Sequence, residues 1–519
     1  MSPSSSPRSA CIFTCSALLA GALAAQDGRQ LFQYTSFGNY GTGGFASAVA
    51  VVGDVDGDGR QDTAAGDPYW QVYQGGFGRV LLISGEDGSV LRTLTTTSLV
   101  GDLVCAIGDV DNNQVPDVVT ASTTSSSGYG SGLGGPKAVT VFSGASGAVV
   151  QSFAISPSAI IGVGDWNNDQ EPDLAVVNGG VIEVYGAAGG ALVTSLGSPA
   201  TGNFSLASVL VGAANARRLV VADATGAVAA YDSNGSVVWN RAGFGALADA
   251  GNVDGDQIGD VIALQTSGAF AEVLSGLDGA TLLTVPGGTQ VAGGVDLDGD
   301  NTVDLAVGDS AANEVRAYSG ANGTQLLSYA GWESNDGMGW GVAMLPAVGT
   351  PPRAAVVAGA PRRFNGTQNG GSVHAIAIAL PGELDGRIEV SGQGCNFQNW
   401  SLRPYGLPPA TGRTANMRFV SNVANGPMWN LHVFGLSNTT YGGGALPAPL
   451  PSGTLSSCVQ LEVSPDLVLF GGGGVFASFA VPSSPAAVGM DIYFQGLNIV
   501  FFMGVNFETS SVAKISIGN

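Results

Sequence analysis

The sequence predicts an all-β protein, a seven-bladed β-propeller followed by a C-terminal β-sandwich. An acidic nine-residue motif occurs five times, and each copy lies between runs of small and β-branched residues that are typical of strands. Neighbouring copies follow one another at intervals of roughly 40 to 60 residues, except between the third and the fourth, where a unit without the motif lies between them. Units of four strands repeated at this interval are characteristic of propeller blades.

Composition narrows the range of functions. The chain has 519 residues, of which 45% are hydrophobic and 11% charged, so it contains enough apolar material for a core and is neither disordered nor a coiled coil. Its net charge is −22 and its only lysines are Lys137 and Lys514. A strongly acidic chain is poorly suited to phosphate backbones or anionic membranes, so nucleic acid is not expected as a partner.

Residues 1–25 have the features of a secretory signal peptide. Arg8 precedes an apolar run from Ala10 to Ala25, which closes on small residues and is followed by polar Gln26. The run is shorter than the ~20 residues of a membrane span, and no other segment is long and apolar enough to be one. We therefore expect a protein that is secreted, extracellular or at the cell surface, with no transmembrane segment after cleavage.

Three cysteines would remain in the mature chain. Cys395 and Cys458 lie in the C-terminal quarter and are the candidates for a disulfide in an oxidising compartment. Cys105 lies in an apolar stretch without a nearby base, so we expect an inert thiol there.

The recurring motif places Asp or Asn at positions 1, 3 and 5 and Asp at position 9. The five copies are Asp54, Asp56, Asp58, Asp62; Asp109, Asp111, Asn113, Asp117; Asp165, Asn167, Asp169, Asp173; Asn252, Asp254, Asp256, Asp260; and Asp296, Asp298, Asp300, Asp304. Carboxylates this close repel one another unless a cation lies among them, and Ca²⁺ prefers six to eight oxygen ligands. The sequence therefore predicts about five calcium sites.

Two further loop positions bear on these sites. Position 7 varies freely, as expected if only its backbone carbonyl binds the metal; its residues are Arg60, Val115, Glu171, Ile258 and Thr302. Position 6 is glycine in the first copy alone, and the residues there are Gly59, Gln114, Gln170, Gln257 and Asn301. We expect the four loops without this glycine to be weaker or differently shaped.

Each unit continues with a second hairpin, whose turn is rich in glycine. The turns lie at 84–88, 143–147, 186–190, 232–235, 275–279 and 319–323. Two further units, at 209–223 and 339–361, keep their strands but lack the carboxylates, which brings the number of blades to seven. The last unit lacks its fourth strand. Residues 28–34 align with the outer strand at 323–329, so we expect the N-terminal segment to complete the seventh blade.

These units resemble the FG-GAP repeats of integrin α-subunit propellers, which belong to a class that includes VCBS-type repeats of secreted bacterial proteins. The resemblance is carried by residues 45–48, by the first acidic loop with Ala65-Gly66-Asp67-Pro68, and by Ala358-Gly359-Ala360-Pro361 in the last unit. It implies a calcium-binding propeller over residues 26–381 with a role in adhesion or ligand binding. An Arg-Gly-Asp peptide and an Asp-x-Ser-x-Ser site are both absent from the sequence.

Residues 382–519 read as a second domain with short strands between Gly, Pro, Ser and Asn turns. We predict a β-sandwich there, with strands at 417–420, 431–434, 459–463, 467–470, 475–481 and 490–497.

Little in the sequence points to catalysis. The two histidines, His374 and His432, lie on predicted strands, and no nucleophile elbow, phosphate-binding loop or dinucleotide motif occurs. We therefore expect an extracellular binding or adhesion module for a protein or polysaccharide ligand, and predict no catalytic residues. Two alternatives stay open: a calcium-dependent lyase or hydrolase acting on polysaccharides, and a structural component of the cell surface.

Four aromatic residues near the loops between blades have two readings. They either stack on sugars or a protein partner, or pack between blades; they are Trp70, Tyr73, Trp332 and Trp340.

Overall fold

The protein is described by a computed structural model. In the N-terminal part it describes residues 26–36, 44–70, 78–122, 138–197, 204–212, 216–333, 335–349, 352–363, 370–380 and 383. Between 387 and 517 it describes mainly the strands named below. The predicted signal peptide, Tyr73, Cys395 and Cys458 lie outside the described residues.

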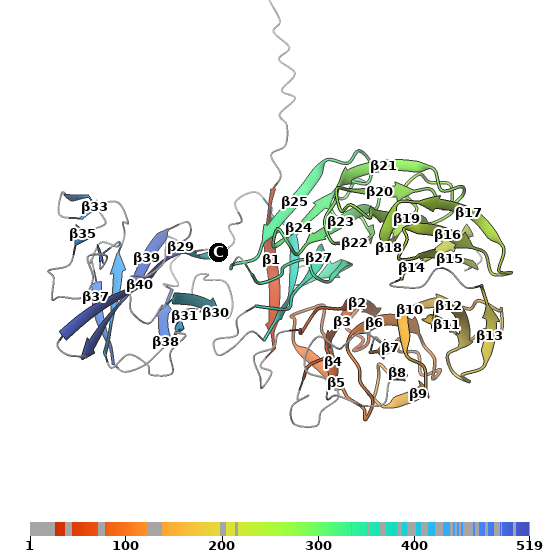
Figure 1. The fold of residues 1–519 in the computed structure, drawn as a ribbon, viewed down its shortest axis with the longest axis horizontal. Coiled ribbons are helices and arrows are strands. Elements are labelled where there is room, and N and C mark those ends of the chain that lie inside the picture. Colours follow the sequence, from red (N-terminus) through yellow and green to blue (C-terminus); the bar gives the residue numbers. More distant parts are fainter. Residues whose placement is uncertain are drawn as a thin grey trace, which may run out of the picture.

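Strands β1 to β28 form a ring of seven four-stranded antiparallel blades (Figure 1). The first three blades contain β2 (Val49–Gly53), β3 (Asp62–Asp67), β4 (Arg79–Ile83) and β5 (Val90–Leu94); β6 (Leu103–Gly108), β7 (Asp117–Ala121), β8 (Val139–Phe142) and β9 (Val149–Phe153); and β10 (Pro157–Gly164), β11 (Asp173–Asn178), β12 (Val181–Gly186) and β13 (Leu192–Ser195). The first strand of each blade contacts the first strands of its neighbours, so these strands surround the central axis.

The other four blades follow the same order. They contain β14 (Ser205–Val211), β15 (Ala216–Ala222), β16 (Ala227–Tyr231) and β17 (Val237–Ala242); β18 (Phe244–Gly251), β19 (Asp260–Gln265), β20 (Phe270–Leu274) and β21 (Thr281–Pro286); β22 (Gln290–Val295), β23 (Asp304–Asp309), β24 (Glu314–Tyr318) and β25 (Gln325–Ala330); and β26 (Val342–Val348), β27 (Arg353–Ala360), β28 (Ser372–Ile378) and β1 (Gln26–Thr35). We number the blades 1 to 7 in this order.

The core is divided among the blades. Seven clusters of buried apolar side chains fill the interfaces, and each cluster combines residues of two neighbouring blades. The second strands β3 and β7 are buried along their whole length, and those of the other blades are buried along most of theirs. This explains why the strands that follow the acidic loops are rich in Ala, Val, Leu and Ile, since both faces of the blade are covered.

The N-terminal strand closes the ring, as predicted. β1 pairs antiparallel with β28, from Gly28 opposite Ile378 to Thr35 opposite Ser372. Its first residues also pair in parallel with β25, where Gln26 lies opposite Leu327, so blades 6 and 7 share one eight-stranded sheet. The pairing covers an edge that would otherwise expose unpaired backbone groups.

The C-terminal part forms two larger sheets. Their strands are β29 (Arg387–Ser391), β40 (Val505–Ser516), β39 (Asp491–Phe501), β32 (Trp429–Gly435) and β37 (Leu467–Gly472) in one, and β30 (Ser401–Tyr405), β31 (Thr414–Val420) and β38 (Phe476–Ala480) in the other. Short ladders join β33 (Thr440–Tyr441) to β34 (Gly444–Ala445) and β35 (Ala448–Pro449) to β36 (Gln460–Leu461). The sequence predicted the strands near 417, 431, 467, 475 and 490 but not β29, β30 or β40. A sandwich of the two sheets remains a prediction.

Among the described residues, no helix has the length and hydropathy that crossing a bilayer requires.

Candidate metal centre

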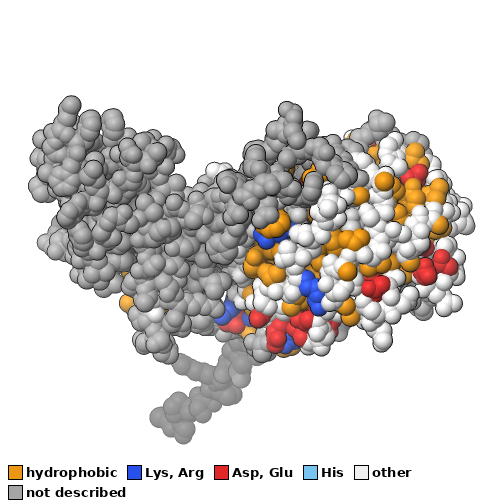
Figure 2. Space-filling view, turned by 90° about the horizontal axis from the view of Figure 1, so that it is seen from below, with side chains coloured by type: hydrophobic (Ala, Val, Ile, Leu, Met, Phe, Trp, Pro, Cys, Tyr) orange, Lys and Arg blue, Asp and Glu red, His pale blue; other side chains and the backbone are white. Residues whose placement is uncertain are grey.

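The five acidic loops occupy equivalent places in five blades. Each joins the first strand of its blade to the second, as β2 to β3 or β22 to β23. Because the first strands all run in the same direction around the axis, the loops lie on one face of the ring (Figure 1). In Figure 2 acidic side chains gather in separate clusters along the margin of the described part, and basic side chains lie beside some of them.

The position-1 side chain organises each loop by accepting backbone hydrogen bonds. In the first loop Asp54 accepts from Gly57 N at 2.7 Å and from Gly59 N at 2.9 Å. Asp296 accepts equivalent bonds from Gly299 N at 2.7 Å and Asn301 N at 2.8 Å. These bonds turn the backbone around the carboxylate, as in Asx turns.

The position-5 side chain makes the same contact in all five loops. It accepts a hydrogen bond of 2.7 to 2.9 Å from the N–H of the position-7 residue; the donors are Arg60, Val115, Glu171, Ile258 and Thr302. This bond uses the N–H of position 7, so the position-7 carbonyl remains the predicted metal ligand.

The five loops share one backbone conformation despite their different residues. Position 6 has a positive φ in every loop, from 67° at Asn301 to 84° at Gly59. Position 4 is also left-handed in every loop, and its residues are Gly57, Asn112, Asn168, Gly255 and Gly299. Loops without glycine at position 6 therefore keep the left-handed turn at this residue. Whether they bind calcium more weakly stays a prediction. The position-1 side chain and its backbone hydrogen bonds hold the left-handed turn even where a non-glycine residue adds strain.

The position-9 aspartates, which we call the anchor aspartates, serve a purpose that the sequence analysis did not identify. All five are fully buried at the first residue of the second strand. Asp304, for example, accepts from Leu297 N of its own loop at 2.6 Å and from Gly320 N of the outer turn at 3.0 Å. Each such carboxylate ties the acidic loop to the turn between the third and fourth strands.

Blade 3 departs from this arrangement for a steric reason. In four blades the outer turn donates to the anchor from a glycine, and a Cβ at Gly320 would lie 1.9 Å from Val303 O. Blade 3 has Ala187 at this place, and its N–H donates to Pro172 O at 3.1 Å instead. The Asp173 Oδ1 atom is left buried without a hydrogen-bond partner. One feature of the sequence could have indicated the second role of position 9. This position is Asp in all five copies, whereas positions 1, 3 and 5 also allow Asn.

The loop carboxylates are destabilised electrostatically in the absence of a cation. Burial, with added repulsion from neighbouring loop carboxylates, raises the pKa of Asp62 and Asp304 to about 6. The same causes raise the pKa of Asp56 and Asp298, which occupy position 3. Backbone hydrogen bonds oppose the shift without cancelling it. A divalent cation would remove this penalty.

The loops differ in how many carboxylates they bring together. Carboxylate oxygens at positions 1, 3 and 5 lie within 4.8 Å of one another in the loops of Asp54 and Asp296. In the second loop the cluster consists of Asp109, Asp111 and Asp117. The remaining two loops contain an amide in place of one carboxylate, at Asn167 and at Asn252. The Asn167 Nδ2 atom lies 2.9 Å from Asp169 Oδ2.

The donor set fits calcium. It consists only of hard oxygen ligands on a short loop, and in three of the loops the carboxylates converge within 4.8 Å of one another. Even where the anchor aspartate accepts two backbone bonds, each of its oxygens keeps a second lone pair for a metal. Aspartates at positions 1, 3 and 5 with the anchor would hold the ion, which would supply positive charge and cross-link the loop.

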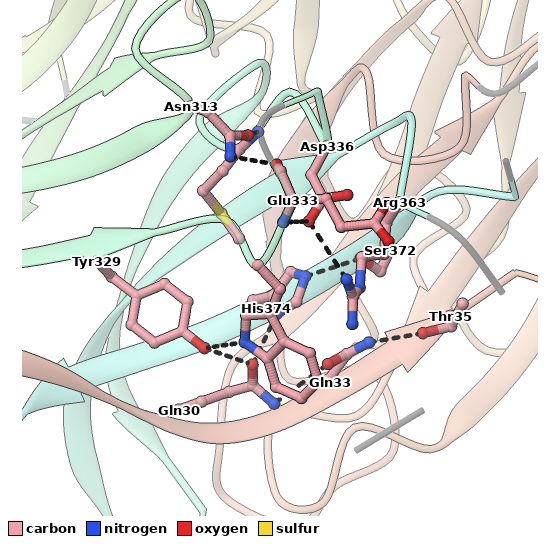
Figure 3. Close-up of polar contacts among 12 residues, drawn as sticks. Gln30, Gln33, Thr35, Asn313, Tyr329, Glu333, Asp336, Arg363, Ser372 and His374 are labelled. Carbon is pink, nitrogen blue, oxygen red and sulfur yellow. Dashed lines mark hydrogen bonds and ion pairs between the residues drawn. The ribbon is translucent and has the colours of Figure 1, made fainter. Parts of the chain in front are cut away.

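His374 is structural, as expected. It is 1% exposed, and its ring nitrogens lie 2.8 Å from Gln30 Oε1 and 2.7 Å from Ser372 Oγ (Figure 3). Burial, reinforced by the positive charge of Arg363, lowers its pKa to about 3. Tyr329 also donates to Gln30 Oε1, at 3.0 Å. This network attaches the closing strand β1 to blades 6 and 7. His432 lies on β32, and nothing more is described of it.

A buried ion pair lies beside this network. Arg363 Nη1 and Asp336 Oδ2 are 3.3 Å apart, and both side chains are 1% exposed (Figure 3). The Arg363 guanidinium also lies 4.4 Å from the ring centroid of Trp332. Of the two readings for Trp332, packing between blades is therefore the correct one, because the residue is 7% exposed and packs in this interface. Trp340, in contrast, is 41% exposed.

Cys105 fits the prediction of an inert thiol. It packs against the apolar cluster between blades 2 and 3, and burial raises its pKa to about 12. The thiolate is the reactive form, so this cysteine is a poor nucleophile at neutral pH.

Comparisons with known proteins return structural similarity alone. No protein-family model matches the sequence, and no curated protein matches it. One similar solved structure is described as the crystal structure of BBS1N in complex with ARL6DN, soaked with lead. It has a TM-score of 0.45 and 12% sequence identity, and the match covers 69% of this chain and 98% of that chain. The assignment of a seven-bladed propeller rests on the strand order of the chain itself.

Proposed function

We propose that this chain is a secreted, calcium-stabilised propeller of the FG-GAP type that acts as an extracellular binding or adhesion module, with a β-sandwich as its second domain. One observation carries the calcium part of the proposal. Five loops with different residues adopt the same backbone turn, with oxygen ligands at the same positions. The residues at positions 4 and 6 differ between the loops, whereas the oxygen-bearing residues at positions 1, 3, 5 and 9 are kept. This pattern is expected if every loop has to bind the same ion.

Calcium in this proposal is structural. Each loop supplies enough oxygens to complete its own coordination sphere, and the loops tie the strands nearest the axis to the outer turns through the anchor aspartates. A site that binds only the folded state stabilises it by about 2.7 kcal/mol when free calcium is a hundred times the Kd. Several such sites would contribute a large part of the stability of an ordinary domain.

The binding role is supported by what the scaffold provides. A propeller closed by its own N-terminal strand is a rigid platform, and its loops are free to vary on the face away from the metal. The histidine on a blade is buried in a structural network, so it offers no base to a substrate.

The test is thermal unfolding of the mature full-length protein with calcium and with a chelator, together with elemental analysis of bound metal. We expect about five calcium ions per chain and a large fall in melting temperature on chelation. The Asp54→Asn/Asp56→Asn/Asp58→Asn variant should lose one ion, whereas Asp278→Asn, in an exposed turn outside the loops, should lose none. A protein that binds no calcium, or is equally stable in chelator, would contradict the proposal.

A further inference from the structure

Two tryptophan–arginine pairs lie on the face of the propeller opposite the acidic loops. Trp70 follows the end of β3, and its ring centroid is 4.8 Å from the Arg79 guanidinium. Trp340 precedes the start of β26, and its ring centroid is 5.3 Å from the Arg362 guanidinium. The end of a second strand and the start of a first strand share one face, and the acidic loops occupy the other.

The two pairs are on adjoining blades and border the same turn. Residues 44–47 lead into blade 1, and Gly44 N donates to Pro361 O of blade 7 at 2.9 Å. On the other side of this turn, the Tyr69 ring lies so close to Gly44 that a Cβ there would be 2.5 Å from it. The turn therefore joins the segment next to Arg362 to the segment next to Trp70.

The two arginines differ in whether an acidic side chain of the protein pairs with their positive charge. Arg79 is half-buried, forms an ion pair with Asp67 at 3.0 Å and donates to Ser36 Oγ at 2.9 Å. Arg362 is exposed, and its guanidinium has no ion pair among the residues that the structure describes. The Trp340–Arg362 pair thus combines an accessible ring with an uncompensated positive charge.

The backbone holds this second pair in place before any ligand arrives. Trp340 N donates to Gly337 O at 3.1 Å and to Gly359 O at 3.3 Å, and Arg362 N donates to Asp336 O at 2.9 Å. Gly337 and Gly339 have positive φ values of 74° and 82°, which lets the chain turn tightly before the indole. These bonds fix the main chain that carries the pair, so less of the chain has to be ordered on binding, which favours recognition.

From these observations we propose that Trp340 and Arg362 form a saccharide-binding site that recognises a sugar carrying a single carboxylate within an otherwise neutral glycan. The indole would pack on the apolar face of the sugar ring, and the guanidinium would pair with the carboxylate. The inference names a ligand class for the proposed binding module and rests on that function. A polyanionic chain is disfavoured because the protein has a net charge of −22 and, in the described part of this site, Arg362 is the one cation without an ion pair.

The test compares three probes on the calcium-saturated, full-length protein by titration calorimetry. They are a xylo-oligosaccharide bearing one glucuronate, the same oligosaccharide without it, and an oligogalacturonate. We expect the singly charged probe to bind about tenfold more tightly than the neutral one. Its preference should shrink as salt is raised, because an exposed pair is screened.

Two variants locate the site. Trp340→Ala should weaken binding of the singly charged probe about tenfold or more, and Arg362→Gln should abolish its advantage over the neutral probe. Leu277→Ala, which also trims an exposed apolar residue, and Arg92→Gln, which also removes a charge, should bind like the unmodified protein. Unchanged melting temperatures would show that the two site variants are folded.

Three results would overturn the inference: no binding of the charged probe, equal binding of the charged and neutral probes, or a charge preference that survives Arg362→Gln. Tightest binding of the oligogalacturonate would also reject it in favour of a polyanion site. None of these results affects the calcium count or the effect of chelator, so failure of this site and failure of the calcium-stabilised module can be told apart.

Discussion

The five blades with acidic loops and the two without them hold their loops by different means. In three of the acidic blades the carboxylates of the loop converge within 4.8 Å of one another, and in all five we propose that a calcium ion joins them. Blade 4 lacks these carboxylates, and the end of β14 instead pairs with the loop of blade 5, through Gly212 N to Gln257 O at 2.8 Å and Gly259 N to Leu210 O at 2.7 Å.

Blade 7 also lacks the carboxylates and is held by buried polar groups. Its connections are the Arg363–Asp336 ion pair and the contacts of His374 with Gln30 and Ser372. With calcium bound as we propose, one blade fold would be secured in three ways: by a metal, by direct backbone pairing or by a buried ion pair. Only the first should respond to a chelator.

The largest effect is expected from breaking the ion pair of blade 7. Arg363→Ala leaves Asp336 buried without its partner, which typically costs about 3 to 5 kcal/mol of unfolding free energy. The loss should be the same with calcium and with chelator, as measured by chemical denaturation. Arg92→Ala, at a half-exposed outer-strand arginine, is the control. A double variant with Asp336→Ala should be less destabilised than the sum of the single variants, and strict additivity would argue against the pair.

The anchor aspartates should come next. Asp304→Ala leaves two backbone N–H groups without an acceptor, and we expect a loss of about 3 kcal/mol in chelator as well as in calcium. Asp173→Ala should cost less, because Asp173 does not hold the outer turn: the two N–H groups that it accepts, Trp166 N and Asn167 N, belong to its own loop, and its Oδ1 has no partner. Denaturation of both variants in chelator checks this. Equal losses would show that Ala187 does not weaken the contact between the anchor aspartate and the outer turn in blade 3.

His374 should make stability depend on pH. The folded protein keeps the ring neutral to a pKa of about 3, whereas the unfolded chain takes up the proton near 6.5. The unfolded state therefore binds more protons between these values, and stability falls as pH drops through this window. From pH 7 to pH 5 the loss should be about 2 kcal/mol.

The buried loop carboxylates act in the opposite sense in metal-free protein, because their raised pKa makes the folded state bind protons first below about pH 6. The contribution of His374 is therefore the difference between the unmodified protein and His374→Gln in saturating calcium. Parallel stability curves for the two proteins would refute the assignment.

The smallest effect concerns position 6 of the loops. Gln114 has a φ of 71°, a conformation that glycine adopts without strain. Gln114→Gly should stabilise the protein by less than about 1 kcal/mol, because relief of strain is offset by the greater freedom of glycine in the unfolded chain. Gly59→Ala should have the opposite sign. Differential scanning calorimetry of both variants measures these changes in stability. A lower melting temperature for Gln114→Gly, or a higher one for Gly59→Ala, would contradict a shared left-handed turn at position 6.

Much of the architecture could be predicted from the sequence because it depends on local patterns. Alternating strands, turns with glycine and the spacing of the acidic loops gave the number of blades, and the similarity of 28–34 to 323–329 gave the closing strand. The C-terminal strands were predicted only in part: β29, β30 and β40 were missed, although glycine flanks each of them. Pro404 within β30 and the polar run at 508–511 within β40 interrupt the apolar pattern that marks a strand.

The ligand pattern was visible in the sequence because it lies on one short loop, where positions 1, 3 and 5 are set by local geometry. The hydrogen bonds from the outer turns to the anchor aspartates could not be predicted from the sequence. Their donors, Gly320 and Gly85, belong to another hairpin and approach the carboxylate only in the folded blade. The burial of Trp332 and the exposure of Trp340 likewise depend on neighbouring blades. The sequence by itself determined which segments form strands and where carboxylates cluster, because these follow from contacts within a few residues. Only the tertiary structure decided which polar groups are buried together and which ring faces solvent, because those depend on segments brought together by closure of the ring.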